Sequence, residues 1–146
     1  MDAFETWARR QGTVSIIILT ALFAVIINLA IYGIATLAGA TFDFTDEGEA
    51  YHVYALTLIG FTAIPLLAGL TALAILGRWW RVLYAVAIVI APIIAIATIF
   101  TMTIPADLDS GSTAALAAAH IVVGICAAGG SIALRALVPR STFRFA

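Results

Sequence analysis

Four long stretches of the chain contain no charged side chain. They cover residues 11–42, 50–77, 82–106 and 110–134, and the shortest holds 25 residues. A helix needs about 20 mostly apolar residues to cross a hydrocarbon layer about 30 Å thick. Each stretch is therefore long enough for one crossing but too short for two crossings and a turn. The pattern predicts four transmembrane helices.

The apolar cores of these stretches place the spans at residues 13–38, 53–77, 82–104 and 113–138. Every backbone amide in hydrocarbon must be satisfied within its own segment, so we expect helices even though the spans are rich in Ile and Val. The connections are short, so consecutive helices should be antiparallel neighbours. The predicted fold is an all-α, integral membrane four-helix bundle with up-down-up-down topology, in a single domain of residues 1–146.

The composition excludes most soluble enzyme classes. Of the 146 residues, 64% are hydrophobic and 10% are charged, whereas soluble domains have about 45–50% apolar and about 25% charged residues. The charged residues are seven Arg, no Lys and eight acids. The chain therefore has no basic field that would attract a nucleic-acid partner.

The arginines indicate how the chain is oriented. With four crossings, all seven arginines fall on one side of the membrane and six of the eight acids fall on the other. The positive-inside rule makes the arginine side cytoplasmic. We therefore expect a multi-pass protein of the cell membrane with both termini in the cytoplasm. The arginines are Arg9, Arg10, Arg78, Arg81, Arg135, Arg140 and Arg144.

Aromatic rings gather at both predicted membrane boundaries, where such rings prefer to lie. The predicted interfacial anchors on the cytoplasmic side are Trp7, Arg78, Trp79, Trp80 and Arg81. The rings on the outer side are Phe42, Phe44, Tyr51 and Tyr54. We interpret the first group as a girdle with snorkelling arginines, and a specific lipid-headgroup site is the alternative.

The first span also resembles a signal peptide, because an apolar run follows Arg9-Arg10 and ends at the small residues Ala38-Gly39-Ala40. The apolar core of a signal peptide spans about 7–15 residues, and this run is longer. An uncleaved signal anchor is therefore the expected outcome, and cleavage is the alternative.

The predicted membrane interior contains no Asp, Glu or Lys, and no Arg before the cytoplasmic end of the fourth span. A retinal Schiff base would need a lysine, and thiol chemistry would need a partner for Cys126, the single cysteine. Carboxylate-dependent export is excluded because the interior has no acidic residue. A metalloprotease site of the H-E-x-x-H type is excluded because the chain lacks this motif. We predict no catalytic residue and no metal site.

The most polar residues of the interior are Asn28 and His120. His120 lies on a stripe of small residues that runs from Thr113 to Ser131, so we expect it to hydrogen-bond across a close helix contact. A ligand-binding or proton-responsive histidine is the alternative. Haem ligation is disfavoured, because His52, the second histidine that a bis-histidine site would need, belongs at the outer interface. No cofactor is expected.

Asn28 should form an interhelical hydrogen bond, and its depth in the membrane matches that of His120, so we predict that the two meet. Pro65 and Pro92 should kink their helices and free backbone carbonyls that could line a cavity. The candidate residues for a cavity or for interhelical polar contacts are Asn28, Tyr32, Pro65, Pro92, His120 and Ser131.

The outer segment of residues 43–49 holds four carboxylates. Its spacing resembles a calcium-binding loop only superficially, because the acids do not alternate before a glycine and no bidentate acid follows. We interpret it as a solvated anionic loop, and weak binding of a divalent cation is the alternative.

Three short motifs resemble a family of small, uncharacterised four-span membrane proteins from actinobacteria. They are Arg9-Arg10 before the span that holds Asn28, the Arg78-Trp79-Trp80-Arg81 turn, and Ala119-His120-Ile121-Val122 followed by residues 135–140. The use of Arg without Lys fits the same source. The resemblance implies no known activity and no catalytic residue.

Two classes of function fit these observations. The first is a non-enzymatic membrane protein, either an accessory subunit of a larger membrane complex or a module that forms a homo-oligomer, with the lipid bilayer as its constant partner. The second is a binding or permeation protein with an internal cavity for a lipid, a quinone-like molecule or another apolar ligand. We expect that the protein is not an enzyme.

Overall fold

The computed structural model describes residues 3–46 and 48–138, without the side chains of residues 3–5, 9 and 46. The elements are α1 (Ala3–Leu37), β1 (Asp43–Asp46), β2 (Glu49–His52), α2 (Ala55–Leu76), α3 (Val82–Thr98), the π-helical turn η1 (Ile99–Thr103) and α4 (Ser110–Leu137). Four segments are long and apolar enough to cross a membrane: Arg10–Leu37, Ala55–Leu76, Val82–Thr103 and Ser110–Leu137. They match the four predicted spans to within three residues at each end.

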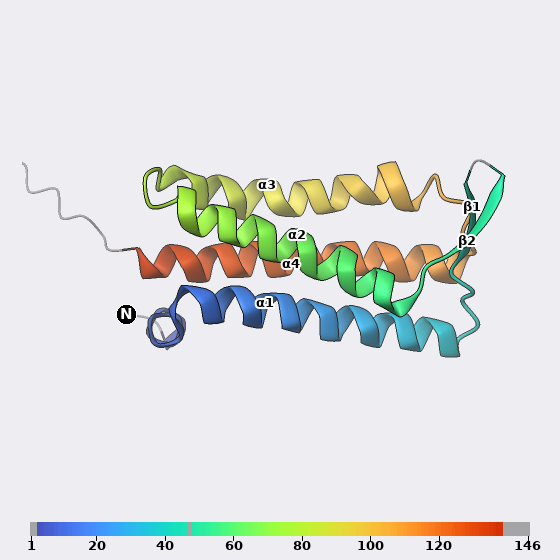
Figure 1. The fold of residues 1–146 in the computed structure, drawn as a ribbon, viewed down its shortest axis with the longest axis horizontal. Helices are drawn as coiled ribbons and strands as arrows, with labels where there is room; N and C mark the ends of the chain where they lie inside the picture. Colours follow the sequence, from blue (N-terminus) through green and yellow to red (C-terminus); the bar gives the residue numbers. More distant parts are fainter. Residues whose placement is uncertain (1–2, 47, 139–146) are drawn as a thin grey trace, which may run out of the picture.

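Helix α4 lies in the middle of the fold, with α1 and α3 packed along it. Helix α1 also packs against α2, whereas α2 and α3 adjoin only beside the turn that links them (Figure 1). Figure 1 shows α2 running diagonally across α4, from the side of α3 to the side of α1. Away from the turn, α2 therefore diverges from α3 (Figure 1).

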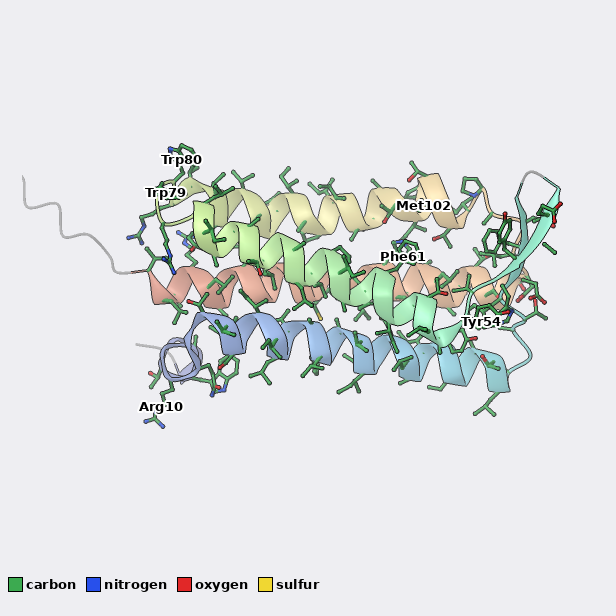
Figure 2. All side chains as sticks on the ribbon, in the orientation of Figure 1. Arg10, Tyr54, Phe61, Trp79, Trp80 and Met102 are labelled. Atoms are coloured by element: carbon green, nitrogen blue, oxygen red, sulfur yellow. The ribbon has the colours of Figure 1, made fainter. Side chains whose placement is uncertain are left out.

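Charged residues mark the two ends of the molecule. We call the end with β1 and β2 the hairpin end and the opposite end, with Arg10, Arg78, Arg81 and Arg135, the arginine end. Figure 2 shows Trp79 and Trp80 at the arginine end, on the turn between α2 and α3. Among the described residues the arginines and the acids Asp43, Glu49, Asp107 and Asp109 thus occupy opposite ends. Asp2, Glu47, Arg140 and Arg144 lie outside the described residues.

Helix α1 bends at Gly12, whose φ of 75° and ψ of 165° are not helical. Only glycine adopts such a conformation without a steric penalty. The segment before the bend, which carries Trp7, is seen end-on in Figure 1 and so points away from the rest of α1. The sequence indicated where the span begins but not this preceding helix.

The segment interpreted as a solvated loop forms a two-stranded antiparallel hairpin instead, in which Asp43 pairs with His52 and Phe44 with Tyr51. The rings of Phe44 and Tyr51 stack with centroids 5.5 Å apart. Such cross-strand aromatic pairs stabilise a hairpin, and Gly48 supplies the positive φ, 87°, that a tight turn needs. Asp43, Asp46 and Glu49 thus lie on paired strands, and the side chains of Asp43 and Glu49 are exposed, as expected for a solvated acidic segment.

Phe42, one of the rings expected at the outer interface, is buried within the protein. Its side chain is only 1% exposed and packs on Tyr32, with ring centroids 4.4 Å apart. Its φ of 58° lies in the left-handed region that β-carbons disfavour. The backbone N–H of Phe42 donates to Ser112 Oγ at 2.8 Å, and this bond holds the residue in place.

Asp109 joins the start of α4 to the end of the α1–β1 connection. Its carboxylate caps α4 by accepting from the backbone N–H of Ser112 at 2.9 Å, and it also accepts from the Ser112 hydroxyl. The backbone N–H and the hydroxyl of Thr41 donate to the same carboxylate, each at 3.0 Å. The bonds from Ser112, followed by those from Thr41, hold the pKa of Asp109 well below the ordinary value of 3.8.

Asp109→Ala is therefore expected to lower the melting temperature of the detergent-solubilised protein, whereas Asp107→Ala, at an exposed acid two residues earlier, should leave it nearly unchanged. Because folding lowers the pKa of Asp109, its stabilisation is present above the unfolded pKa and is lost as the pH falls through the folded pKa. The difference in melting temperature between wild type and Asp109→Ala should thus stay constant from about pH 8 to about pH 5 and shrink only below about pH 4. A difference that disappears by pH 6 would contradict this assignment.

The small residues of α4 allow close contacts within the chain. A Cβ on Gly124 would lie 3.1 Å from the Cα of Pro92 and 3.1 Å from the Cβ of Ala95, both on α3. A Cβ on Gly130 would lie 2.9 Å from a methyl group of Leu70 on α2. The stripe therefore brings α4 close to its own neighbours.

Candidate functional site

A cavity of about 910 Å³ lies in the space that α2 leaves as it diverges from α3. Its walls come from α2, from α3 with η1, and from α4, and the hairpin residues Phe44, Tyr51 and His52 line its end. Small-molecule sites in proteins measure about 300–1,000 Å³, so this cavity is at the upper end of that range.

Small side chains and one divergent helix create this space. Ala91 and Ala95 face it from α3, and Ala119 and Ala127 face it from α4. Pro65 lines it from α2. Phe61 of α2 and Met102 of η1 also line it and are largely exposed, and Figure 2 shows them flanking the space between these two elements. The cavity is thus open at the side of the molecule, between helices that are apolar enough to cross a membrane.

Asn28 is the most buried polar residue among the lining residues. Its side chain is 1% exposed, and its Nδ2 donates to Thr62 Oγ1 at 2.9 Å, a bond that joins α1 to α2. Its Oδ1 is buried and accepts no hydrogen bond from the described part of the protein. A buried acceptor without a partner costs about 1–3 kcal/mol, so this atom marks a place where a donor is needed.

His120 lines the same cavity from α4. Its Nδ1 lies 2.9 Å from the carbonyl oxygen of Leu116, one turn earlier. A carbonyl oxygen only accepts, so Nδ1 carries the hydrogen and, in the neutral ring, Nε2 is left as an acceptor. Asn28 and His120, which the sequence predicts to meet, line the same cavity, but no hydrogen bond joins them: Asn28 bonds to Thr62 and His120 to the Leu116 carbonyl.

The π-helical turn η1 shapes the wall opposite α2. The N–H of Ile104 donates to the carbonyl of Ile99 at 2.8 Å, the spacing of a π-helix. The extra residue changes which side chains face α4, and Thr103 is buried among the lining residues while Met102 stays exposed at the rim. Thr98, which also lines the wall, donates its hydroxyl to the Ala95 carbonyl at 2.7 Å.

The hairpin end of the cavity is more polar. His52 Nδ1 lies 2.7 Å from Asp43 Oδ1, and its ring meets the ring of Tyr54 edge-on with centroids 4.6 Å apart. His52 and Tyr54 both line the cavity, whereas Asp43 does not. No Asp, Glu or Arg is among the lining residues, and the described residues contain no group of three metal-ligating side chains.

The candidates from sequence fall into two sets. Asn28, Pro65 and His120 line the cavity, whereas Tyr32, Pro92 and Ser131 do not. Tyr32 packs on Phe42, Pro92 packs against Gly124, and the Ser131 hydroxyl donates to the Ala127 carbonyl at 2.7 Å.

Thr62, the partner of Asn28, lines the cavity and was missed by sequence reasoning. Threonine is ordinary in a membrane helix, and the only available signal was the spacing of Thr62 from Pro65 on one face of α2. The predicted interfacial anchors Arg78, Trp79, Trp80 and Arg81 are exposed at the α2–α3 turn, and Trp7 is exposed before the bend in α1.

Four helices long and apolar enough to cross a membrane are typical of a multi-pass membrane protein. The chain belongs to a family of unknown function, DUF6069, whose sequence profile matches residues 8–133. This agrees with the resemblance to an uncharacterised family. Comparisons with curated proteins and with solved structures give no significant match.

Proposed function

We propose that this protein binds a mostly apolar ligand that reaches the cavity from within the membrane. The observation that carries the proposal is the cavity of about 910 Å³, with apolar side walls and with Asn28, whose Oδ1 is buried and unpaired among the described residues, in its lining. Ligand sites are typically of this kind: largely apolar, with a few converging polar groups that orient the ligand.

The orientation in the membrane is part of the same proposal. The four helices form an up-down-up-down bundle in the cell membrane, with the arginine end and both termini in the cytoplasm, as the positive-inside rule favours. The hairpin then lies on the outer side, and the cavity occupies the outer half of the membrane. An actinobacterial source of the family also remains part of this interpretation.

The side opening between α2 and η1 supports access from the bilayer. Its rim residues Phe61 and Met102 are apolar and mostly exposed, so an apolar ligand loses little when it moves from lipid into the space between them. The ligand then gains a hydrogen-bonding partner that lipid tails do not supply. The proposed role needs neither a catalytic residue nor a cofactor.

The alternative role, an accessory subunit or a self-associating module, is less favoured by the packing. Small residues of α4 that could serve contacts between chains are used within this chain, since Gly124 packs against α3 and Gly130 against α2. The proposed binding therefore requires neither a second copy nor a larger complex.

The variant Ala91→Phe tests the proposal, with Ala97→Phe as its matched control. Both alanines lie on α3, but Ala91 lines the cavity, whereas Ala97 is exposed and does not. The added ring should fill the ligand's space, so 4-dodecylanisole should bind about tenfold more weakly to Ala91→Phe than to wild type or Ala97→Phe. Native mass spectrometry of the detergent-solubilised proteins counts the bound probe. Equal binding by all three proteins, or absence of binding by wild type to both this probe and 4-dodecylphenol, would overturn the proposal.

A further inference from the structure

We infer that the ligand is a neutral amphiphile whose polar end donates a hydrogen bond, as an alcohol, a phenol or a hydroquinone does, and that Asn28 Oδ1 accepts it. This inference rests on the proposed function and adds the chemical class of the ligand. It depends on which polar atoms of the cavity are already paired, and on the absence of charge from its walls.

The first step concerns Asn28. Its amide is fixed from one side, because Nδ2 donates to Thr62 Oγ1 at 2.9 Å. The other half of the amide, Oδ1, is buried and accepts nothing from the described residues. A carboxamide oxygen only accepts hydrogen bonds, so the group that satisfies it must be a donor.

The second step concerns His120 of α4, a second polar residue that lines the cavity. Its Nδ1 is engaged by the Leu116 carbonyl at 2.9 Å, which leaves Nε2 as an acceptor in the neutral ring. Two residues from different helices thus line one cavity, and each carries an acceptor atom. A molecule with two hydroxyl groups, such as a hydroquinone, fits this pattern better than the corresponding quinone, whose oxygens only accept.

The third step concerns charge. None of the described lining residues is an Asp, Glu or Arg, so a carboxylate, phosphate or ammonium group on the ligand would meet no counter-charge. Burying an unpaired charge costs far more than burying a hydroxyl group. The polar end is therefore neutral and lies near Asn28, while the apolar body extends toward Phe61 and Met102 at the side opening.

The experiment compares two probes that differ only in one donor, 4-dodecylphenol and 4-dodecylanisole, whose methyl ether cannot donate. Wild type should bind the phenol about tenfold more tightly, because only the phenol satisfies the buried acceptor. In Asn28→Leu, which removes the acceptor but keeps an apolar side chain of similar size, this preference should fall to about one. Ser131→Ala removes a buried hydroxyl that does not line the cavity, so this control should keep the wild-type preference.

The outcomes separate this inference from the proposed function. If wild type binds both probes equally well, or if Asn28→Leu keeps the preference, the donor assignment is overturned and the apolar cavity stands. If neither probe binds, the proposed function fails and the inference fails with it. Should Asn28→Leu not fold, the double variant Asn28→Leu/Thr62→Val replaces both partners of the α1–α2 hydrogen bond by apolar groups and tests the same prediction.

Discussion

Replacement of Phe42 by alanine is expected to lower the free energy of unfolding by about 3–5 kcal/mol, the usual cost of removing a fully buried phenyl ring. Phe42 is 1% exposed and lies on Tyr32, where the end of α1, the hairpin and the start of α4 meet. Its left-handed backbone at φ 58° is strained for phenylalanine and for alanine alike. The substitution therefore loses the packing without relieving the strain.

Phe44→Ala is the matched control, since Phe44 is two residues away, half-buried, and contacts Tyr51 in the hairpin. Its loss should cost about 1 kcal/mol, the scale of one aromatic pair. Titration of SDS into dodecylmaltoside micelles, followed by circular dichroism, measures both free energies. Equal losses for the two variants would show that Phe42 is not buried as described.

A leucine at Gly124 should destabilise the fold by about 1–3 kcal/mol, because it over-packs the contact between α3 and α4. A Cβ at this residue would already lie 3.1 Å from the backbone Cα of Pro92, and backbone atoms cannot move aside as a flexible side chain does. Leucine is a better helix former than glycine by about 1 kcal/mol, so the clash must exceed this gain before any loss is seen.

Gly129→Leu separates these two effects. Gly129 lies on the same helix and is exposed, with nothing within 4 Å of an added Cβ. This variant should keep the gain in helix propensity and be as stable as wild type or slightly more so. The same SDS titration measures both, and a Gly124→Leu protein as stable as Gly129→Leu would contradict the close α3–α4 contact.

The spans could be predicted from the sequence because charge is expensive in hydrocarbon. Arg10, Asp43 and the later charged residues bound the apolar runs, and the spans of the structure begin and end close to them. The sequence was less informative at the ends of the helices. The bend at Gly12, the hairpin and the burial of Phe42 depend on contacts between segments, which hydropathy does not encode.

The site was predicted only in part. Asn28 and His120 stood out because a polar group is rare in a membrane interior, and both line the cavity. Their partners, Thr62 and the Leu116 carbonyl, could not be found in this way. Interhelical pairing depends on the rotation of each helix, and Pro92 shows the same limit, because its side of α3 packs on Gly124 instead of facing the cavity.

The most direct test of ligand binding is to identify the small molecules that remain bound to the protein after purification from the membranes in which it is expressed. Mass spectrometry of extracts from wild type, Ala97→Phe and Ala91→Phe measures them. The account predicts that a neutral, hydroxyl-bearing amphiphile accompanies wild type and Ala97→Phe in about equal amounts and is strongly depleted in Ala91→Phe. The same complement of bound molecules in all three proteins would contradict it.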